Sequence, residues 1–175
     1  MTTIDAQTVT LNGRVSETVN LSVDPNSTQG NIRVHVVSSG DTVRMTLSGS
    51  GAGVIRVPLM VRSNSGFTIR GRFESTTARV TQFSVLNARA TGRLVSSEAV
   101  NNLEVSPRFD RRRLEQNISQ EGFDFSTPFF VCSGPRISLG GTLVSPNNAL
   151  QVTVLVHVKA DSVADWLAYL TFSND

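Results

Sequence analysis

The chain of 175 residues contains one cysteine, one tryptophan, one tyrosine and one lysine. The single cysteine, Cys132, excludes a scaffold held by intramolecular disulfides and gives no indication of redox compartment. No stretch approaches the roughly 20 apolar residues that a membrane helix needs. Charged residues make up only 17% of the chain, against roughly 25% in an average soluble domain. Disorder is not expected, because 39% of the residues are apolar and the net charge is +2.

Length and patterning together predict one β-domain that spans residues 1–175. A chain of this length buries roughly 70% of its unfolded surface, so it needs no metal or disulfide to hold a core. Apolar residues occupy mostly odd positions from Val9 to Val23, an alternation that a helix does not produce. Short alternating runs follow, separated by turn signals about every ten residues, which is typical of a sandwich or barrel. These runs lie at 32–36, 43–47, 55–61 and 67–73, with one or two more at 78–95.

The predicted fold is all-β: an antiparallel β-sandwich, immunoglobulin-like or a related Greek key. Pro58 cannot donate to a strand ladder, so its strand is expected at an edge or with a bulge. Residues 96–122 break the pattern and are predicted as an inserted short helix or crossover loop, with Ser106 and Pro107 as a possible helix start. Strands then resume, and the crowded segment Trp166–Phe172 fits either a final core strand or an exposed interface.

The sequence predicts no catalytic residue, no cofactor and no metal site. Cys132 has no neighbouring base and fits a buried, inert thiol. His35 and His157 fall on the polar sides of their strands, without the spacing of metal ligands. An enzyme of unrecognised type stays as an alternative, and it would need a pocket that gathers acids of residues 96–130 or a histidine.

Four arginines form the candidate site for an anionic ligand: Arg56, Arg62, Arg70 and Arg72. Alternation points all four outward, and antiparallel pairing through the turn at Asn64 would bring Arg62 close to Arg70. Such a cluster attracts polyanions, of which an acidic polysaccharide fits best. Nucleic acid is not expected as a partner, because nucleic-acid-binding sheets usually present aromatic side chains and these phenylalanines point inward. The alternative is that outward arginines keep edge strands soluble.

The segment Val9-Thr10-Leu11-Asn12-Gly13-Arg14-Val15 resembles the N-terminal extension of chaperone–usher pilus subunits. In that family the extension completes the open immunoglobulin-like fold of the next subunit by strand addition. The resemblance implies that Val9, Leu11 and Val15 fill pockets of the partner and that Gly13 allows close approach. Residues 57–70 are also similar to a strand–turn–strand unit common in secreted bacterial β-sandwiches. An ordinary first strand of a self-complete sandwich is the alternative interpretation of this segment.

These observations lead to a hypothesis of a non-catalytic, exported bacterial surface protein with a structural or adhesive role. Its expected partners are protein, either itself or other surface subunits, or polysaccharide. The first alternative is a glycan-binding module that uses the arginines. The expected location is extracellular or at the cell surface, with a signal peptide removed before Met1, and a cytoplasmic location stays open.

Overall fold

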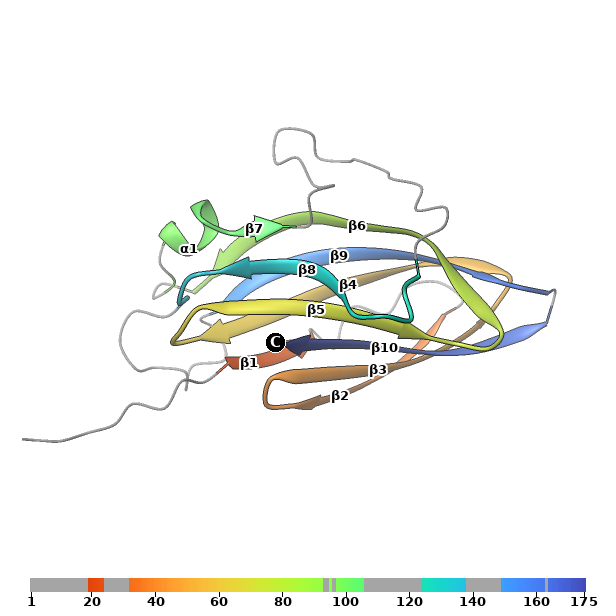
Figure 1. Cartoon of the computed structure of the whole chain (residues 1–175). Coiled ribbons are helices and arrows are strands. Elements are labelled where there is room, and N and C mark those ends of the chain that lie inside the picture. The colour runs from red at the N-terminus through yellow and green to blue at the C-terminus, as the bar shows by residue number, and fades with distance from the viewer. Residues whose placement is uncertain are drawn as a thin grey trace, which may run out of the picture.

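Figure 1 shows a computed structural model of the protein, in which residues 19–23, 32–92, 95, 97–105, 124–137, 149–162 and 164–175 are described. Strands dominate these segments, and the one helix among them, α1, is five residues long. The elements in chain order are β1 (Val19–Val23), β2 (Arg33–Ser39), β3 (Thr42–Ser50), β4 (Ala52–Ser63), β5 (Phe67–Glu74), β6 (Ala78–Thr91), α1 (Ser97–Asn101), β7 (Glu104–Val105), β8 (Phe129–Gly134), β9 (Ala149–Ala160) and β10 (Asp165–Asn174).

The described strands form two antiparallel sheets. The four-stranded sheet has the order β1-β4-β9-β6, and the six-stranded sheet has the order β2-β3-β10-β5-β8-β7. The buried side chains of both sheets belong to one hydrophobic core. The antiparallel β-sandwich predicted from the sequence is therefore confirmed, and the immunoglobulin-like strand order stays a prediction.

The alternation in the sequence decides which side of each strand is buried. Val57 of β4 lies opposite Val154 of β9, and both side chains are fully buried. The residue between, Arg56, lies opposite Leu155 on the outer side of the sheet. Because successive side chains of a strand point to opposite faces, one pattern builds the core and sets the outer surface at the same time.

Consecutive strands from β3 to β6 alternate between the two sheets. β3 passes into β4 through Gly51 alone, whose φ of 65° is in the left-handed region that glycine adopts without strain. β4 passes into β5 through residues 64–66, where Ser63 Oγ accepts a hydrogen bond from the Ser65 N–H at 3.1 Å. The predicted hairpin between Arg62 and Arg70 is therefore wrong. A turn signal marks the end of a strand, but it does not say which sheet the next strand joins.

Pro58 lies in β4, which has β1 on one side and β9 on the other. β1 pairs with β4 only from Leu59 onward, where Val23 lies opposite, so Pro58 has a described partner only in β9, at Thr153. This place suits a residue without an N–H, because no ladder formed by the described residues on the β1 side needs its donor. Among the described residues, β4 is thus an edge at Pro58, as expected, although it is an interior strand further on.

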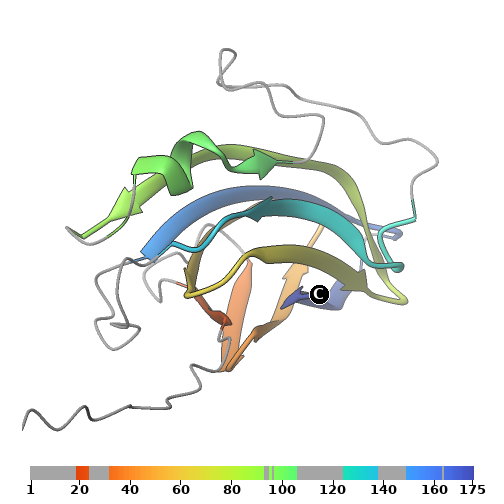
Figure 2. The same ribbon diagram turned by 60° about the vertical axis from the view of Figure 1, so that its left-hand side comes forward.

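The predicted insertion at 96–122 contains α1 and β7 in its described part. α1 lies against β6 (Figures 1 and 2), with Ala99 buried. β7 pairs with β8 and places Val105 opposite Cys132. The helix start predicted at Ser106 lies outside the described residues.

The C-terminal strand β10 lies between β3 and β5. Trp166 and Phe172 are buried on its inner side, whereas Leu167 is 49% exposed on its outer side. Tyr169, also on the outer side, is half-buried. The expected core strand is therefore confirmed for the inner side of β10, whereas an interface on its outer side stays a prediction.

Candidate functional site

The two sheets separate the four arginines that were predicted to form one ligand-binding face. Arg56 and Arg62 belong to β4 in the four-stranded sheet, and Arg70 and Arg72 belong to β5 in the six-stranded sheet. All four alternate with buried residues and so point away from the core, on opposite sides of the sandwich. The prediction of a single arginine face is wrong, because the chain crosses from one sheet to the other at residues 64–66.

The two arginines of β5 are held by carboxylates. Arg70 forms an ion pair with Asp175, the last residue of the chain. Arg72 Nη2 lies 2.8 Å from Glu74 Oε1, two residues further along the strand. Both pairs are exposed, so each contributes little to stability, but each fixes the direction of a guanidinium.

Ser126 adds a second contact for Arg72. The Arg72 Nε–H donates to the Ser126 carbonyl at 2.9 Å. The Ser126 hydroxyl and N–H both donate to Asp124 Oδ1, at 2.6 and 2.9 Å, and these two hydrogen bonds lower the pKa of the Asp124 carboxyl. The loop before β8 is therefore fastened to the outer face of β5.

The outer face of the four-stranded sheet is positively charged. Its described strands contain no aspartate or glutamate. Asp161, just after β9, lies 3.8 Å from the guanidinium of Arg79. Arg62 Nη1 donates to Ser22 Oγ at 3.0 Å, and burial lowers the pKa of Arg62. We call this surface the basic face, and it carries Arg56, Arg62, Arg79, Arg89 and Lys159.

The outer face of the six-stranded sheet mixes apolar, aromatic and charged side chains. Tyr169, the only tyrosine of the chain, lies between Thr46 of β3 and Glu74 of β5. Three large apolar side chains among the described residues are exposed, and two of them, Val37 and Leu167, lie on this face. We call this surface the tyrosine face, and it carries Arg33, His35, Val37, Arg44, Arg72, Glu74, Leu167 and Tyr169.

Arg44 lies over the ring of Tyr169. Its guanidinium carbon is 4.7 Å from the ring centroid, within the range of a cation–π interaction. Arg44 is exposed, and within the described segments it belongs to no ion pair. Its N–H donors therefore face solvent beside an aromatic ring, in a position where a ligand can use both.

An open hollow of about 750 Å³ lies beside Tyr169, within the range of roughly 300–1,000 Å³ that small-molecule sites occupy. Leu167 and Tyr169 supply apolar surface, and the remaining side chains supply hydroxyls, one carboxylate and one guanidinium. The lining residues are Arg44, Glu74, Ser75, Thr76, Thr77, Ser126, Leu167 and Tyr169.

The corner between β5 and β6 fixes one side of this hollow. Ser75 Oγ accepts hydrogen bonds from the N–H groups of Thr77 and Ala78, at 3.1 and 3.0 Å, a serine turn that replaces missing ladder bonds. The same hydroxyl donates to the Leu167 carbonyl at 2.6 Å, and the Leu167 N–H donates to Thr77 Oγ1 at 3.2 Å. The corner is therefore bound to both backbone groups of Leu167, so this side of the hollow is formed before any ligand arrives.

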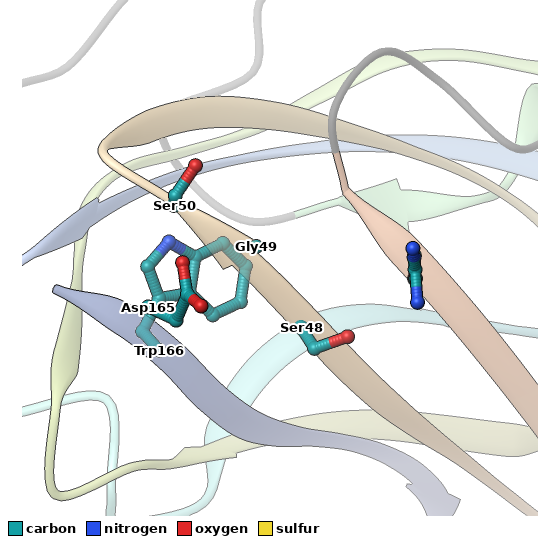
Figure 3. Close-up of a pocket in the computed structure, with 6 residues that line it drawn as sticks. Ser48, Gly49, Ser50, Asp165 and Trp166 are labelled. Atoms are coloured by element: carbon teal, nitrogen blue, oxygen red, sulfur yellow. The ribbon is translucent and has the colours of Figure 1, made fainter.

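A second open hollow, of about 290 Å³, lies at one end of the same face (Figure 3). Ser48 lies opposite Arg33 on one side and opposite Leu167 on the other, so this hollow adjoins the exposed leucine. Its lining residues are Arg33, Ser48, Gly49, Ser50, Asp165 and Trp166.

The cysteine and histidines do not assemble a reactive centre in the described segments. Cys132 is fully buried, and desolvation raises the pKa of its thiol to about 12. This agrees with the expected inert thiol. His35 lies on the tyrosine face and His157 on the outer side of the four-stranded sheet, so they are on different sheets. The described residues contain no cluster of three or more histidine, cysteine or acidic side chains suited to a metal ion.

The residues predicted for strand assembly, Val9, Leu11, Gly13 and Val15, lie outside the described residues, and that interpretation stays a prediction. In the described part of the chain, no helix has the length and apolar character needed to cross a membrane. Comparison with protein-family models, with curated proteins and with solved structures found no match.

Sequence reasoning missed the residues at the centre of the tyrosine face. Arg44, Leu167 and Tyr169 were not predicted as site residues, although the alternation in Trp166–Phe172 contains the signal. Every second residue there is apolar and buried, and a leucine and a tyrosine occupy the positions between them. Large apolar side chains on the solvent side of a strand are the sequence signal that could have identified this candidate surface.

Proposed function

We propose that the protein is a non-catalytic adhesive module that binds an acidic glycan on its tyrosine face. The observation that carries this proposal is the hollow in which Tyr169 and Leu167 lie beside Arg44, Glu74 and the hydroxyls of the β5–β6 corner. The proposal keeps the glycan-binding alternative from the sequence, and it moves the site from four arginines to one face of the six-stranded sheet.

The chemistry of the hollow matches that of a sugar ring. A pyranose has apolar C–H faces and a rim of hydroxyl groups. Leu167 and Tyr169 offer apolar surface for the faces, and Glu74 and the serine and threonine hydroxyls offer acceptors and donors for the rim. A few oriented polar groups around an apolar floor are typical of small-molecule sites.

Arg44 favours a glycan that carries carboxylates. Its planar guanidinium presents a fork of donors that matches a carboxylate. Arg70 and Arg72 already bind Asp175 and Glu74, whereas Arg44 has no such partner among the described residues. The ring of Tyr169 limits the positions that the Arg44 guanidinium adopts, which reduces the entropy lost on binding.

The absence of catalysis in this proposal is supported by the types of residue present. The hollow beside Tyr169 contains one carboxylate, Glu74, and no histidine or cysteine. That carboxylate is engaged in an ion pair with Arg72. A surface location and strand assembly through Val9–Val15 stay predictions from the sequence.

Titration with digalacturonate by calorimetry tests the proposal. Tyr169→Ala is expected to weaken binding at least about tenfold, the equivalent of roughly 1.4 kcal/mol. Arg44→Gln is expected to weaken it by a similar factor, and the effect disappears with the methyl ester of digalacturonate, which lacks the charge. The matched control is Arg56→Gln, the same change on the basic face, which is expected to leave affinity unchanged. Loss of affinity in Arg56→Gln equal to that in Arg44→Gln, or no binding at all, contradicts the proposal.

A further inference from the structure

β2 forms one edge of the six-stranded sheet (Figure 1), and among the described strands it pairs only with β3. An edge strand presents a row of N–H and C=O groups that have no partner in their own sheet, and a strand of another chain can pair with them. Natural proteins usually prevent such pairing by making the edge strand short, bulged or covered. The edges of this sandwich differ in these protective features.

Three of the four edges are protected in the described part of the chain. β7 has two residues and β1 has five. β6 is longer, but its register with β9 shifts twice, between Val80 and Gln82 and between Val85 and Asn87. α1 also lies against β6. Since short or bulged edges twist away from a partner or offer it few groups, these three are poorly suited to receive another strand.

β2 has none of these protective features. Its seven residues pair with β3 in unbroken register, from Arg33 opposite Ser48 to Ser39 opposite Thr42. Arg33 is its only arginine, and the strand contains no lysine, no acid and no proline. β2 is therefore a regular edge along which a second strand can pair over its full length.

Valines on both sides of β2 are incompletely covered. Val37, on the outer side, is 54% exposed, more than any other large apolar side chain in the described segments. Val34 and Val36, on the inner side, pack against the core but are only partly buried. A strand added at this edge would remove apolar surface from water on both faces of the sheet.

The turn after β2 is held in place and carries a carboxylate. The Gly40 carbonyl accepts a hydrogen bond from the Leu21 N–H at 2.8 Å. The Asp41 carbonyl accepts one from the Asn174 N–H at 3.0 Å. In the described segments, neither Asp41 nor Arg33 belongs to an ion pair. β2 thus has a cation at its first residue and an anion just beyond its last.

We propose that β2 pairs antiparallel with β2 of a second copy of this chain, so that the two six-stranded sheets become one continuous sheet. Identical strands pair in this way about a two-fold axis, the commonest symmetry of homodimers. With Val36 opposite Val36 of the second copy, all seven residues are paired and each side chain meets one from the same face. His35 then lies opposite Val37 of the second copy and covers part of it.

The same register brings opposite charges together. Arg33 lies opposite Ser39 of the second copy, next to the turn that carries Asp41, and the two-fold axis repeats this contact at the other end. The two Arg33 residues stay six positions apart along the strands, about 20 Å at a rise of roughly 3.4 Å per residue. This charge complementarity favours a second copy of the chain over a strand of unrelated sequence.

Sedimentation equilibrium of the full-length chain, up to roughly 1 mM, tests the proposal. The native chain is expected to populate a dimer as its concentration rises. Val37→Lys is expected to weaken dimerisation at least about tenfold, because a lysine on an edge strand opposes pairing with another chain. The matched control is Val54→Lys, the same change at the exposed valine of β4, and it is expected to leave dimerisation unchanged.

A charge exchange tests the contact between Arg33 and the turn. Asp41→Arg is expected to weaken dimerisation about tenfold, because like charges then meet at both ends of the paired strands. Adding Arg33→Glu to this variant is expected to restore dimerisation toward the native value. If the double variant dimerises no better than Asp41→Arg alone, the proposed pairing is contradicted.

An introduced cysteine reports on the register. Cys132 is fully buried and its thiol pKa is raised to about 12, so the new cysteine is the one expected to react. Val36→Cys is expected to cross-link two copies in oxidised glutathione, because opposite Cα atoms lie about 4.5–5.5 Å apart, within the span of a disulfide. Ser39→Cys is the control, since its two copies would be about 20 Å apart. Faster cross-linking through Ser39→Cys would contradict the register.

The association does not rest on the function proposed for the tyrosine face, so Tyr169→Ala is expected to leave it unchanged. A native chain that stays monomeric up to roughly 1 mM overturns the inference. Equal weakening in Val37→Lys and Val54→Lys also overturns it, because net charge and not the β2 edge would then govern association. Dimerisation that Val37→Lys leaves at the native value places the contact elsewhere and has the same consequence.

Discussion

The two outer faces of this sandwich come from the same alternating pattern and differ in chemistry. The basic face carries arginine and lysine without any acid in its described strands. The tyrosine face combines the Arg72–Glu74 ion pair and Arg44 with an aromatic ring, an exposed leucine and two hollows. Charge alone attracts polyanions without choosing among them, whereas shaped apolar surface with a few fixed polar groups can select one ligand. The comparison therefore assigns selective binding to the tyrosine face.

The largest effect is expected on stability, from a substitution in the core that both faces share. A Cβ on Gly71 would lie 2.6 Å from Cζ of Phe129, whose ring is held edge-on by Phe83 and Phe125 at centroid distances of 4.9 and 5.2 Å. Gly71→Ala is expected to lower the free energy of unfolding by about 1–3 kcal/mol, as overpacking does. Chemical denaturation measures this change in the free energy of unfolding. Gly66→Ala is the control, because a Cβ there makes only an ordinary 3.6 Å contact, and an equal loss in both variants would contradict the packing argument.

Charge reversal at one arginine on each face sharpens the comparison. Arg44→Glu is expected to weaken digalacturonate binding more than about tenfold, because a like charge then faces the ligand carboxylate. Arg56→Glu makes the same change in net charge on the basic face and is expected to leave the affinity within about twofold of the native value. Calorimetry at physiological salt measures both. Similar losses in the two variants would show that net charge, and not position, governs binding.

Binding of a polyanion tests the basic face, where Tyr169 is expected to play no part. Heparin is expected to bind there weakly and in a salt-dependent way, because attraction between exposed charges is screened. Replacing Arg56 and Arg89 together by glutamine is expected to lower the salt concentration that elutes the protein from a heparin column. Tyr169→Ala is expected to leave elution unchanged. An elution shift caused by Tyr169→Ala would instead show that heparin binds the tyrosine face as well. The two faces would then not be separate binding sites.

The smallest effect is expected at Arg70, which lies on the outer side of β5 but is held by Asp175. Arg70→Gln removes an exposed ion pair and is expected to lower the free energy of unfolding by less than about 1 kcal/mol. Digalacturonate affinity is expected to stay at the native value, since this guanidinium is already engaged. A tenfold loss of affinity in Arg70→Gln would mean that the site extends further along β5 than the hollow does.

The sequence predicted the fold class because alternation reports directly on which side of a strand is buried. The runs around Val43, Ile55 and Phe67 all became strands whose apolar residues lie in the core. Strand order was not predictable in the same way, since the residues between Ser63 and Phe67 favour a turn whether the chain returns to the same sheet or crosses to the other. The position of Arg62 relative to Arg70 depended on that choice alone.

The site was less predictable than the fold for a related reason. Arg44 and Tyr169 are 125 positions apart in the sequence, and they meet because β3 and β10 pair in register. No local pattern encodes that pairing. The exposed positions of Leu167 and Tyr169 were visible in the alternation of the last strand, but the guanidinium that completes the site was visible only in the folded chain.

A fluorine label on Tyr169 tests the central claim most directly. Because Tyr169 is the only tyrosine, protein grown with 3-fluorotyrosine gives one ¹⁹F resonance that reports on this face alone. Digalacturonate is expected to shift this resonance in the native chain and in Arg56→Gln at the same concentrations, whereas in Arg44→Gln the shift is expected to need about tenfold more ligand. A resonance that does not move while calorimetry records binding, or a shift that depends on Arg56, would contradict the assignment of glycan binding to the tyrosine face.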